Sequence, residues 1–562
     1  MMESVIYNPL AEYESKYKSL HREKTVAFLD NLVKESGISI EENRKTVAEY
    51  NTYKENIKKL RKKFNRLRFL RVLLILLIIL VPFGVYGALG DIILSGGALV
   101  LFGGIFIPVI IKKLTPSIRK LREDIEQADK KASELLSLAY EQMKPLNELF
   151  CENDSVNLVE DAIPLLTFNS HFSSSQQEDM KVNYDFATDP DAMESTMDVL
   201  SGYYNENPFL FENKIIHTMG EETYHGYKTI TWTETYRDSS GKLQRRTRSQ
   251  TLHASVIKPK PFYHTQVVLD YGSQGAPDLC FSRDATHLDR KSEKALERYV
   301  ERGEKRIKRK TDRAIKGNDD FMSMSNTEFE VIFDALDRTD EVQFRTLFTP
   351  LAQTNMVDIL LSESGYGDDF GFIKQKRMNF IISKHSQGRK IKLVPDDYKS
   401  YSYDIIEENF VSKNEEFFRA VYFDFAPLWS VPAYQERPIH SLKPLPEYSS
   451  IYAQKECEAL LNMVDASEVV HPDTKTQAII RSSFVKSQNS IDEISVLAYS
   501  YDIEPRQDVI PVLGGDGHYH NVIVPWDEYI PLKSQKKFFV AEKDKTDLDR
   551  MMATRNNLCI FN

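Results

Sequence analysis

The feature that most constrains this 562-residue chain is an apolar run at residues 72–111, in which Asp91 is the only charged side chain. As a single helix, these forty residues would be about 60 Å long, twice the ~30 Å hydrocarbon core of a bilayer. The stretch "GALGDIILSGG" contains Gly87, Gly90 and Asp91, which are typical turn residues. We therefore expect two transmembrane helices, 69–88 and 92–111, rather than a buried hairpin, since few soluble helices are apolar on every face.

Basic residues flank this run on both sides, whereas the turn between the two predicted spans carries no Lys or Arg. Because positive charge stays on the cytoplasmic side, both termini should be cytoplasmic and the protein should reside in the cell membrane. The four cysteines are scattered, which predicts reduced thiols rather than a disulfide framework. The flanking basic residues are Lys58, Lys59, Arg61, Lys62, Lys63, Arg66, Arg68 and Arg71 before the run, and Lys112, Lys113, Arg119, Lys120 and Arg122 after it.

Amphipathic helices are predicted on both sides of the spans. Gly37 should end a helix over residues 10–36, and Ser39 with Glu42 has capping-box spacing for the next helix. We expect the two apolar stripes to form an antiparallel coiled-coil stalk, although the downstream domain could cover them instead. The stripes, at steps of three and four, are Val47, Tyr50, Tyr53, Ile57, Leu60, Phe64 and Leu67, and then Ile118, Leu121, Ile125, Ala128, Ala132, Leu135, Ala139, Met143, Leu146 and Leu149.

After residue 150 the pattern changes to that of β-strands. Ile230, Trp232, Glu234 and Tyr236 alternate with threonines, a period of two that is typical of a strand. Turn residues at 238–241 are followed by one long or two short strands through residue 257, and by a further strand at 262–272. These segments predict an antiparallel meander. The histidines on the strands, His225, His253 and His264, are typical surface or core groups rather than ligands.

A highly charged helix is predicted over residues 288–316. Its last fifteen residues carry eight basic side chains against Glu304 and Asp312, a net charge of +6. Such a segment can bind anionic lipid headgroups or an acidic protein, or it can simply be a solvated helix face. Nucleic acid is not favoured, because no aromatic side chains interleave to stack on bases. The candidate binding residues are Arg302, Lys305, Arg306, Lys308, Arg309, Lys310, Arg313 and Lys316.

Two short motifs resemble catalytic or metal sites. In "GYGDDFGF", Asp368 and Asp369 resemble the paired aspartates of polymerase palms, but a Gly-rich turn explains them without a nucleotide pocket. In "GGDGHYH", Asp516, His518 and His520 are weak candidate metal ligands. The same glycines suit a hairpin turn between "DVIPVL" and "NVIVPWDEYIPL", so no metal site is favoured. The chain lacks the common nucleophile, nucleotide and zinc motifs, and we predict no cofactor.

The remaining segments mix helices, at 326–339 and 341–361, with strand-like aromatic residues at 417–434. The predicted fold is therefore a membrane-anchored α+β protein: a two-helix transmembrane hairpin, flanking coiled-coil helices, and a large cytoplasmic α+β region that contains an antiparallel meander. The expected divisions are 1–68 (N-terminal helices), 69–112 (hairpin), 113–150 (stalk), 151–285 (β-rich domain), 286–316 (charged helix) and 317–562 (C-terminal α+β domain).

The stretch "FNSHFSSSQQED", with Phe168, Ser170, Phe172, Glu178 and Asp179, follows the helical N-terminus, the two spans and the stalk. This layout, over about residues 40–270, resembles a family of two-span bacterial membrane proteins of unknown activity. The resemblance implies a bacterial inner membrane and assigns no catalytic residue.

These observations favour a membrane-anchored cytoplasmic scaffold or binding protein. One alternative is a membrane-tethered enzyme whose site is assembled from the C-terminal α+β region, because groups distant in sequence would not be recognised here. Another is an oligomeric channel or transporter component, although the spans lack ionisable residues apart from the turn Asp91. The expected partner is the bilayer, with anionic headgroups or an acidic protein as candidates, and a homo-oligomer is compatible with the sequence. The net charge of −10 gives no overall case for nucleic acid.

Overall fold

The computed structural model describes residues 5–89, 92–187, 189, 192–237, 239, 241–317, 321–362, 364–439, 450–543, 551–555 and 558–561. Gly90 and Asp91 of the predicted turn lie outside the described residues, as do the side chains at 82, 84–89, 92, 94–96 and 98. The chain forms two compact units. Unit 1 comprises Met1–His21, Ser155–Leu393 and Glu416–Asn562, and unit 2 comprises Arg22–Asp154 and Val394–Glu415.

Unit 2 is helical. It contains most of α2 (Lys18–Ser36), α3 (Ile40–Leu89), α4 (Ile92–Val109), a π-helical turn (Ile110–Leu114) and α5 (Thr115–Asn147). Gly37 has φ +63°, and the Ser39 hydroxyl accepts a hydrogen bond from the Glu42 amide at 3.3 Å. The predicted break and restart of the helix at this point are confirmed.

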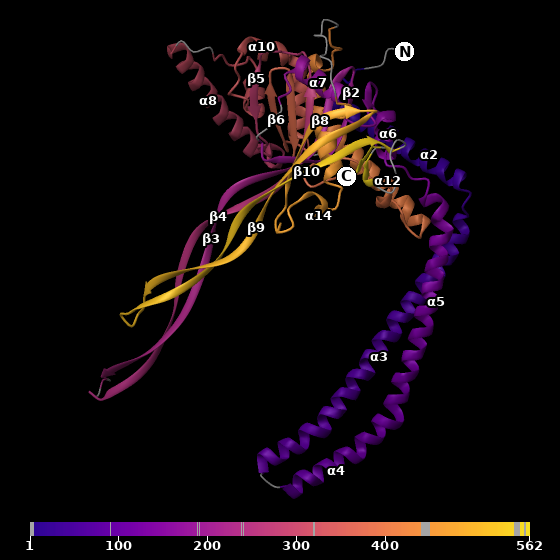
Figure 1. Ribbon diagram of the computed structural model, residues 1–562, viewed down its shortest axis with the longest axis vertical. Coiled ribbons are helices and arrows are strands. Elements are labelled where there is room, and N and C mark those ends of the chain that lie inside the picture. The colour runs from indigo at the N-terminus through magenta and orange to yellow at the C-terminus, as the bar shows by residue number, and fades with distance from the viewer. Residues whose placement is uncertain are drawn as a thin grey trace. The chain divides into compact units, whose positions relative to one another are not determined.

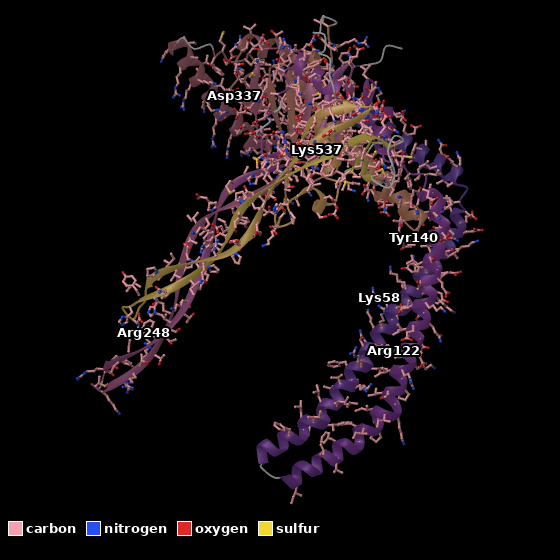
Figure 2. The ribbon with its side chains drawn as sticks, in the orientation of Figure 1. Lys58, Arg122, Tyr140, Arg248, Asp337 and Lys537 are labelled. Atoms are coloured by element: carbon pink, nitrogen blue, oxygen red, sulfur yellow. The ribbon has the colours of Figure 1, made fainter. Side chains whose placement is uncertain are left out.

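Helices α3 and α5 pack side by side and run antiparallel (Figure 1). Ile57 is buried with Ala128 and Ala132 in a small apolar cluster, and Arg61 pairs with Asp129 at 2.9 Å. Lys58 and Arg122 lie on these two helices (Figure 2). The two stripes therefore meet as expected, while a coiled coil in the strict sense remains a prediction.

Part of the predicted stalk is covered by a later segment of the chain. The ring of Tyr401 contacts the rings of Tyr50 and Tyr140, at centroid distances of 5.7 and 5.6 Å. Arg44 pairs with Asp404 at 2.8 Å. One stripe residue, Tyr50, thus contacts this later segment, while Ile57 packs on α5; cover of the stripes by a downstream domain remains a prediction.

Among the described residues, one helix, Leu99–Asn147, is long and apolar enough to cross a membrane. Large apolar side chains project outward from α3 and α4: Phe69 and Phe83 are 69% and 76% exposed, and Ile93 and Val100 are 85% and 74% exposed. These exposed apolar side chains indicate membrane association through a candidate spanning helix. The second span remains a prediction.

Unit 1 is built on a seven-stranded antiparallel sheet with the order β1-β2-β3-β4-β7-β6-β5. Its first four strands pair consecutively, as in a meander. The strands are β1 (Leu166–Phe168), β2 (Glu194–Tyr204), β3 (Asn207–Arg237), β4 (Leu243–Gly272), β5 (Cys280–Arg283), β6 (Phe370–Gln375) and β7 (Met378–Ser383).

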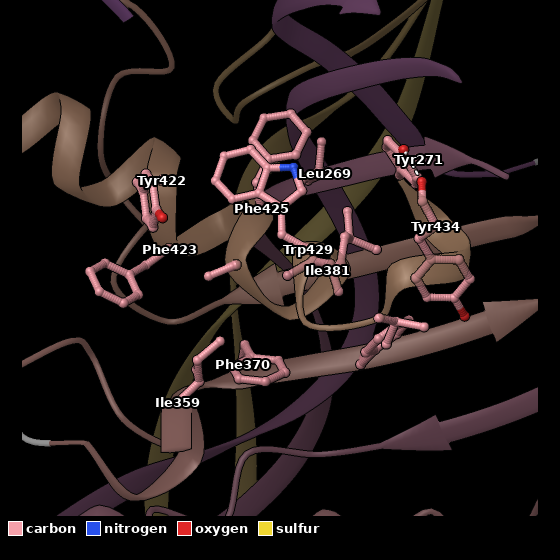
Figure 3. Packing of buried hydrophobic residues seen from close by; sticks show 14 of the residues in the cluster. Leu269, Tyr271, Ile359, Phe370, Ile381, Tyr422, Phe423, Phe425, Trp429 and Tyr434 are labelled. Carbon is pink, nitrogen blue, oxygen red and sulfur yellow. Dashed lines mark hydrogen bonds between the residues drawn. The ribbon is translucent and has the colours of Figure 1, made fainter. Parts of the chain in front are cut away.

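One face of this sheet packs on helix α12 (Tyr403–Trp429) in an aromatic core (Figure 3). Leu269 and Ile381 come from the sheet, and Phe425 and Trp429 stack at a centroid distance of 5.1 Å. The strand expected over residues 417–434 is therefore wrong. The segment is apolar on almost every face because it is buried all round, which hides the helical period.

The second sheet is five-stranded and antiparallel, with the order β11-β12-β10-β9-β8. Its strands are β8 (Ile479–Gln488), β9 (Ile491–Leu513), β10 (Tyr519–Glu542), β11 (Met551–Arg555) and β12 (Leu558–Phe561). The hairpin predicted around "GGDGHYH" is confirmed, since β9 pairs with β10 along its whole length.

Two long hairpins, β3–β4 and β9–β10, extend together from the body of unit 1 (Figure 1). β4 is one continuous strand that pairs with β3 from Leu243 to Tyr271, so the separate strand expected at 262–272 does not exist. The hairpins join through a buried cluster that includes Ile230, Leu252 and Val524. Part of the predicted 238–241 turn lies outside the described residues.

The helices of unit 1 connect and cover these sheets. They are α1 (Pro9–Glu12), which continues through a π-helical turn (Tyr13–Tyr17) into α2, then α6 (Asp154–Ala162), α7 (Ser174–Tyr184), α8 (Glu293–Gly317), α9 (Thr327–Phe333), α10 (Glu341–Leu347), α11 (Pro350–Leu361), α13 (Gln454–Leu461) and α14 (Ala466–Val469). The protein is thus α+β with two antiparallel sheets. The four cysteines all lie in the described part of the chain and form no disulfide there, and Cys457 and Cys559 are buried.

Candidate functional sites

The predicted charged helix corresponds to α8, preceded by a 3₁₀ turn at Leu288–Arg290. Its packed face contains Gly303, Ile307 and Ala314, and a Cβ at Gly303 would collide with Val331 of α9. This close approach fixes which side chains of α8 point to solvent.

Two of the eight candidate basic residues are used to hold α8 in place. Arg306 pairs with Asp334 at 2.6 Å. Lys310 donates to the Leu336 carbonyl and lies 4.0 Å from the centre of the Phe321 ring. The other six are exposed and make no ion pair with a described residue: Arg302, Lys305, Lys308, Arg309, Arg313 and Lys316.

Five of these six form one stripe along α8. Arg302, Lys305, Arg309, Arg313 and Lys316 follow each other at steps of three and four, the spacing that places side chains on one helix face. We call these five residues the basic stripe. It can present several positive charges at once to a flat anionic surface.

The paired aspartates of "GYGDDFGF" are both occupied by structural contacts. Asp368 is fully buried, pairs with Arg283 and accepts from the Thr286 amide at 3.1 Å. Asp369 accepts from the His385 amide and ring, at 3.0 and 2.7 Å. Neither carboxylate is free to bind a nucleotide metal, so the Gly-rich turn interpretation accounts for them.

His385 is the centre of a buried polar network. Its ring pairs with Asp369 at 2.7 Å and with Asp424 at 3.2 Å, and it stacks on Tyr366 at a centroid distance of 3.8 Å. Burial alone would lower the pKa of His385, but the two carboxylates raise it to about 9. Ser386 donates to Asp424 at 2.7 Å rather than to His385, so the network is not a nucleophile–base arrangement.

At the tip of the β9–β10 hairpin, His520 Nε2 pairs with Asp516 at 2.9 Å, and Asp516 also accepts from the His518 amide at 3.1 Å. The side chain of His518 is exposed and does not join them. No group of three His, Cys, Asp or Glu residues suited to a metal exists in the described part of the chain. The three candidates therefore organise a turn.

A charged cavity of about 240 Å³ lies on the opposite face of the seven-stranded sheet from the aromatic core. Alternate residues of β3, β4, β6 and β7 line it, as expected for one sheet face, and α7, α13 and β8 complete it. Seven ionisable side chains on these elements and on β2 line the cavity: Glu194, Glu212, Asp270, Glu458, Lys214, Lys455 and Arg481.

Most of these charges are paired with each other. Glu212 contacts Lys455 at 2.5 Å and accepts from Thr196 at 2.6 Å, and Lys214 pairs with Glu194 at 2.8 Å. Burial alone would raise the pKa of Glu212, but Lys455 and Lys214 hold it below its usual value.

Arg481, on β8, contacts Glu458 of α13 at 3.3 Å and donates to the Ala192 carbonyl at 2.6 Å. These pairs place each of the three cations in the wall of the cavity against one carboxyl group, and burial raises the pKa of one of the three, Glu458, in spite of Arg481. Pairing of this kind is what buried charges require in order to remain ionised.

Asp270 of β4 is the exception. It is only 4% exposed and lines the cavity, and its carboxyl group makes no hydrogen bond or ion pair with another described residue. Burial, followed by the nearby charge of Glu212, raises the pKa of Asp270 to about 7. A strongly shifted carboxyl group in a cavity is typical of a functional site.

The cavity was not identified from the sequence, because its residues come from segments as distant as Glu194 and Arg481. One local signal existed: Asp270 interrupts the apolar stretch "VVLDYG" in the middle of a sheet. A lone carboxylate at a core position of a strand requires either a partner or a ligand.

In comparisons with known proteins, no family model, no curated protein and no solved structure matches this chain.

Proposed function

We propose that this protein is an integral membrane protein, anchored by a two-span hairpin at 69–88 and 92–111, with both termini in the cytoplasm. The observation that carries the proposal is the position of the N-terminal segment. Ile6, Tyr13 and Tyr17 are buried in the same core as Phe209 and Trp429, which follow the hairpin in sequence.

The chain segments before and after the hairpin therefore share one core, and both must lie on the same side of any membrane. This supports an even number of crossings, so the candidate helix Leu99–Asn147 needs a partner span in the apolar part of α3. The antiparallel packing of α3 and α5 and the basic flanks support the same topology. The resemblance of residues 40–270 to two-span bacterial membrane proteins is in keeping with it.

The function that we propose for unit 1 is binding rather than catalysis: a membrane-anchored scaffold that engages anionic headgroups through the basic stripe of α8. Each basic residue near an anionic surface contributes about 1 kcal/mol. Because the anchor already keeps unit 1 close to the bilayer, weak affinity is enough for binding. A tethered enzyme is the second candidate, and the specific observation in its favour is the charged cavity around Asp270.

The binding role can be tested with the full chain reconstituted into liposomes. An environment-sensitive fluorophore is attached to an Asp312→Cys variant, at an exposed position of α8 beside the stripe, after Cys151 and Cys280 are changed to Ser. We expect its emission to shift to the blue in anionic liposomes but not in zwitterionic ones, and the shift to disappear at high salt because the charges are screened.

A matched variant controls for non-specific adsorption. Changing Arg302, Lys305, Arg309 and Arg313 to Gln should abolish the shift, whereas changing four exposed lysines of unit 2 outside the basic flanks of the hairpin, Lys34, Lys45, Lys130 and Lys144, to Gln should preserve it. Identical spectra in anionic and zwitterionic liposomes at low salt would show that α8 is a solvated helix face.

A further inference from the structure

We infer that the cavity bounded by β3, β4, α7 and α13 is a binding site for a small organic monocation that carries a primary ammonium group, with Asp270 as its counter-ion. This inference concerns unit 1 alone and does not depend on the membrane anchor.

The first argument is the unused hydrogen-bonding capacity of the cavity wall. Asp270 is 4% exposed, and its carboxyl group makes no hydrogen bond or ion pair with a described residue. Gln177, on α7, also lines the cavity, and its side-chain oxygen is buried and accepts no hydrogen bond from a described residue. Both groups are acceptors, so the complementary ligand is a donor, and an ammonium group carries three donors.

The second argument is charge. Apart from Asp189 at the exposed rim, the lining has four carboxyl groups and three cationic groups, and the three cations are matched by Glu194, Glu212 and Glu458. Ionised Asp270 is the unbalanced charge, and one positive charge on a ligand would neutralise it. Asp189, at the exposed rim, adds a further carboxylate that favours entry of a cation.

The third argument is size and donor type. A volume of about 240 Å³ is equivalent to roughly eight water molecules, which suits a ligand of a few carbon atoms. A divalent metal is disfavoured, because Mg²⁺ and Ca²⁺ need six or more oxygen ligands and most carboxylate oxygens here are engaged with Lys or Arg. Phe186, Val268 and Phe380 supply apolar contact for a short carbon chain.

The groups that face Asp270 determine how binding responds to pH. They are Glu212 and Lys214 on β3, Glu194 on β2, Lys455 and Glu458 on α13, and Arg481 on β8. Because Asp270 must be ionised to hold the ammonium group, affinity should increase from about pH 6 to about pH 8, across the pKa of about 7.

The test is a thermal-unfolding titration of the full chain in zwitterionic nanodiscs with n-propylamine, ethanolamine, n-propanol and glycine. We expect the two amines to raise the melting temperature in a saturable way, more at the higher pH, and n-propanol and glycine to have no effect. Stabilisation by glycine but not by the amines, or no response to any of the four compounds, would overturn the proposal.

Variants assign the effect to the cavity. Asp270→Asn should abolish the amine response, whereas Asp161→Asn, an exposed aspartate on α6, should preserve it. Gln177→Met, which removes the second acceptor without altering Asp270, should weaken amine binding by about tenfold. An unchanged amine response in Asp270→Asn would overturn the proposal, and if that variant does not fold, an unchanged response in Gln177→Met would overturn it.

Discussion

At the scale of single residues, the buried ionisable groups distinguish this protein most clearly. Lys374 is completely buried, and burial lowers its pKa to about 7. Burial instead raises the pKa of Asp270, also to about 7. Burial would lower the pKa of an isolated histidine, but the pKa of His385 is raised, because Asp424 and Asp369 on either side stabilise the protonated ring. Each of these groups makes stability depend on pH in a definable window.

His385 gives the clearest prediction. Its pKa in the folded protein, about 9, lies above the ordinary 6.5, so its contribution to stability is complete below pH 6.5 and is lost as the pH rises through 9. The shift corresponds to roughly 3 kcal/mol. In thermal unfolding, the stability difference between the wild type and His385→Gln should shrink from about pH 7 to about pH 9.5.

The control is Thr265→Ala, because Thr265 is exposed on β4 and its side chain does not titrate. The stability difference between this variant and the wild type should stay constant with pH. A difference for His385→Gln that also stays constant would mean that the ring is not held protonated by the two aspartates.

At the scale of elements, the sequence predicted the structure well for helices and strands that have one buried face and one exposed face. The stripes of α3 and α5, the cap at Ser39 and the β9–β10 hairpin all follow from local spacing. Prediction failed for α12, whose aromatic residues are buried all round, and for the length of β4, whose outer half is stabilised by the neighbouring hairpin. The cavity could not be predicted, because strand pairing brings Glu212 and Asp270 together and the packing of α13 on the sheet adds Lys455.

The contact between the two long hairpins rests on Gly226 of β3. A Cβ at this position would collide with the backbone oxygen of Ile523 on β10, which cannot move as a side chain can. Gly226→Ala should therefore destabilise unit 1 by about 1–3 kcal/mol in denaturant unfolding.

Gly220→Ala on the same strand provides a matched control, because its Cβ would meet only the Phe262 ring, at 2.9 Å. A ring can rotate away, so this variant should be close to neutral or slightly stabilising. Equal stability of the two variants would show that the hairpins are not held in close contact at Gly226.

At the scale of the whole molecule, the two units are interleaved in sequence. Unit 1 needs residues from both sides of the apolar hairpin, since Tyr422 donates to the Pro9 carbonyl at 2.8 Å and Gln435 donates to the Ile6 carbonyl at 2.7 Å. The segment that contains Ile6 and Pro9 is thus part of the folded core of unit 1. This arrangement is the physical basis for the proposal that the chain returns to the side of the membrane on which it began.

Cysteine labelling in intact cells tests this central claim most directly. In a background with Cys151 and Cys280 changed to Ser, single cysteines replace Asp91, in the predicted turn, and Thr247, an exposed residue of β4. With a membrane-impermeant thiol reagent, we expect Asp91→Cys to be labelled in intact cells and Thr247→Cys only after the membrane is opened. Labelling of Thr247→Cys in intact cells, or labelling of Asp91→Cys only after opening, would contradict a two-span hairpin with cytoplasmic termini.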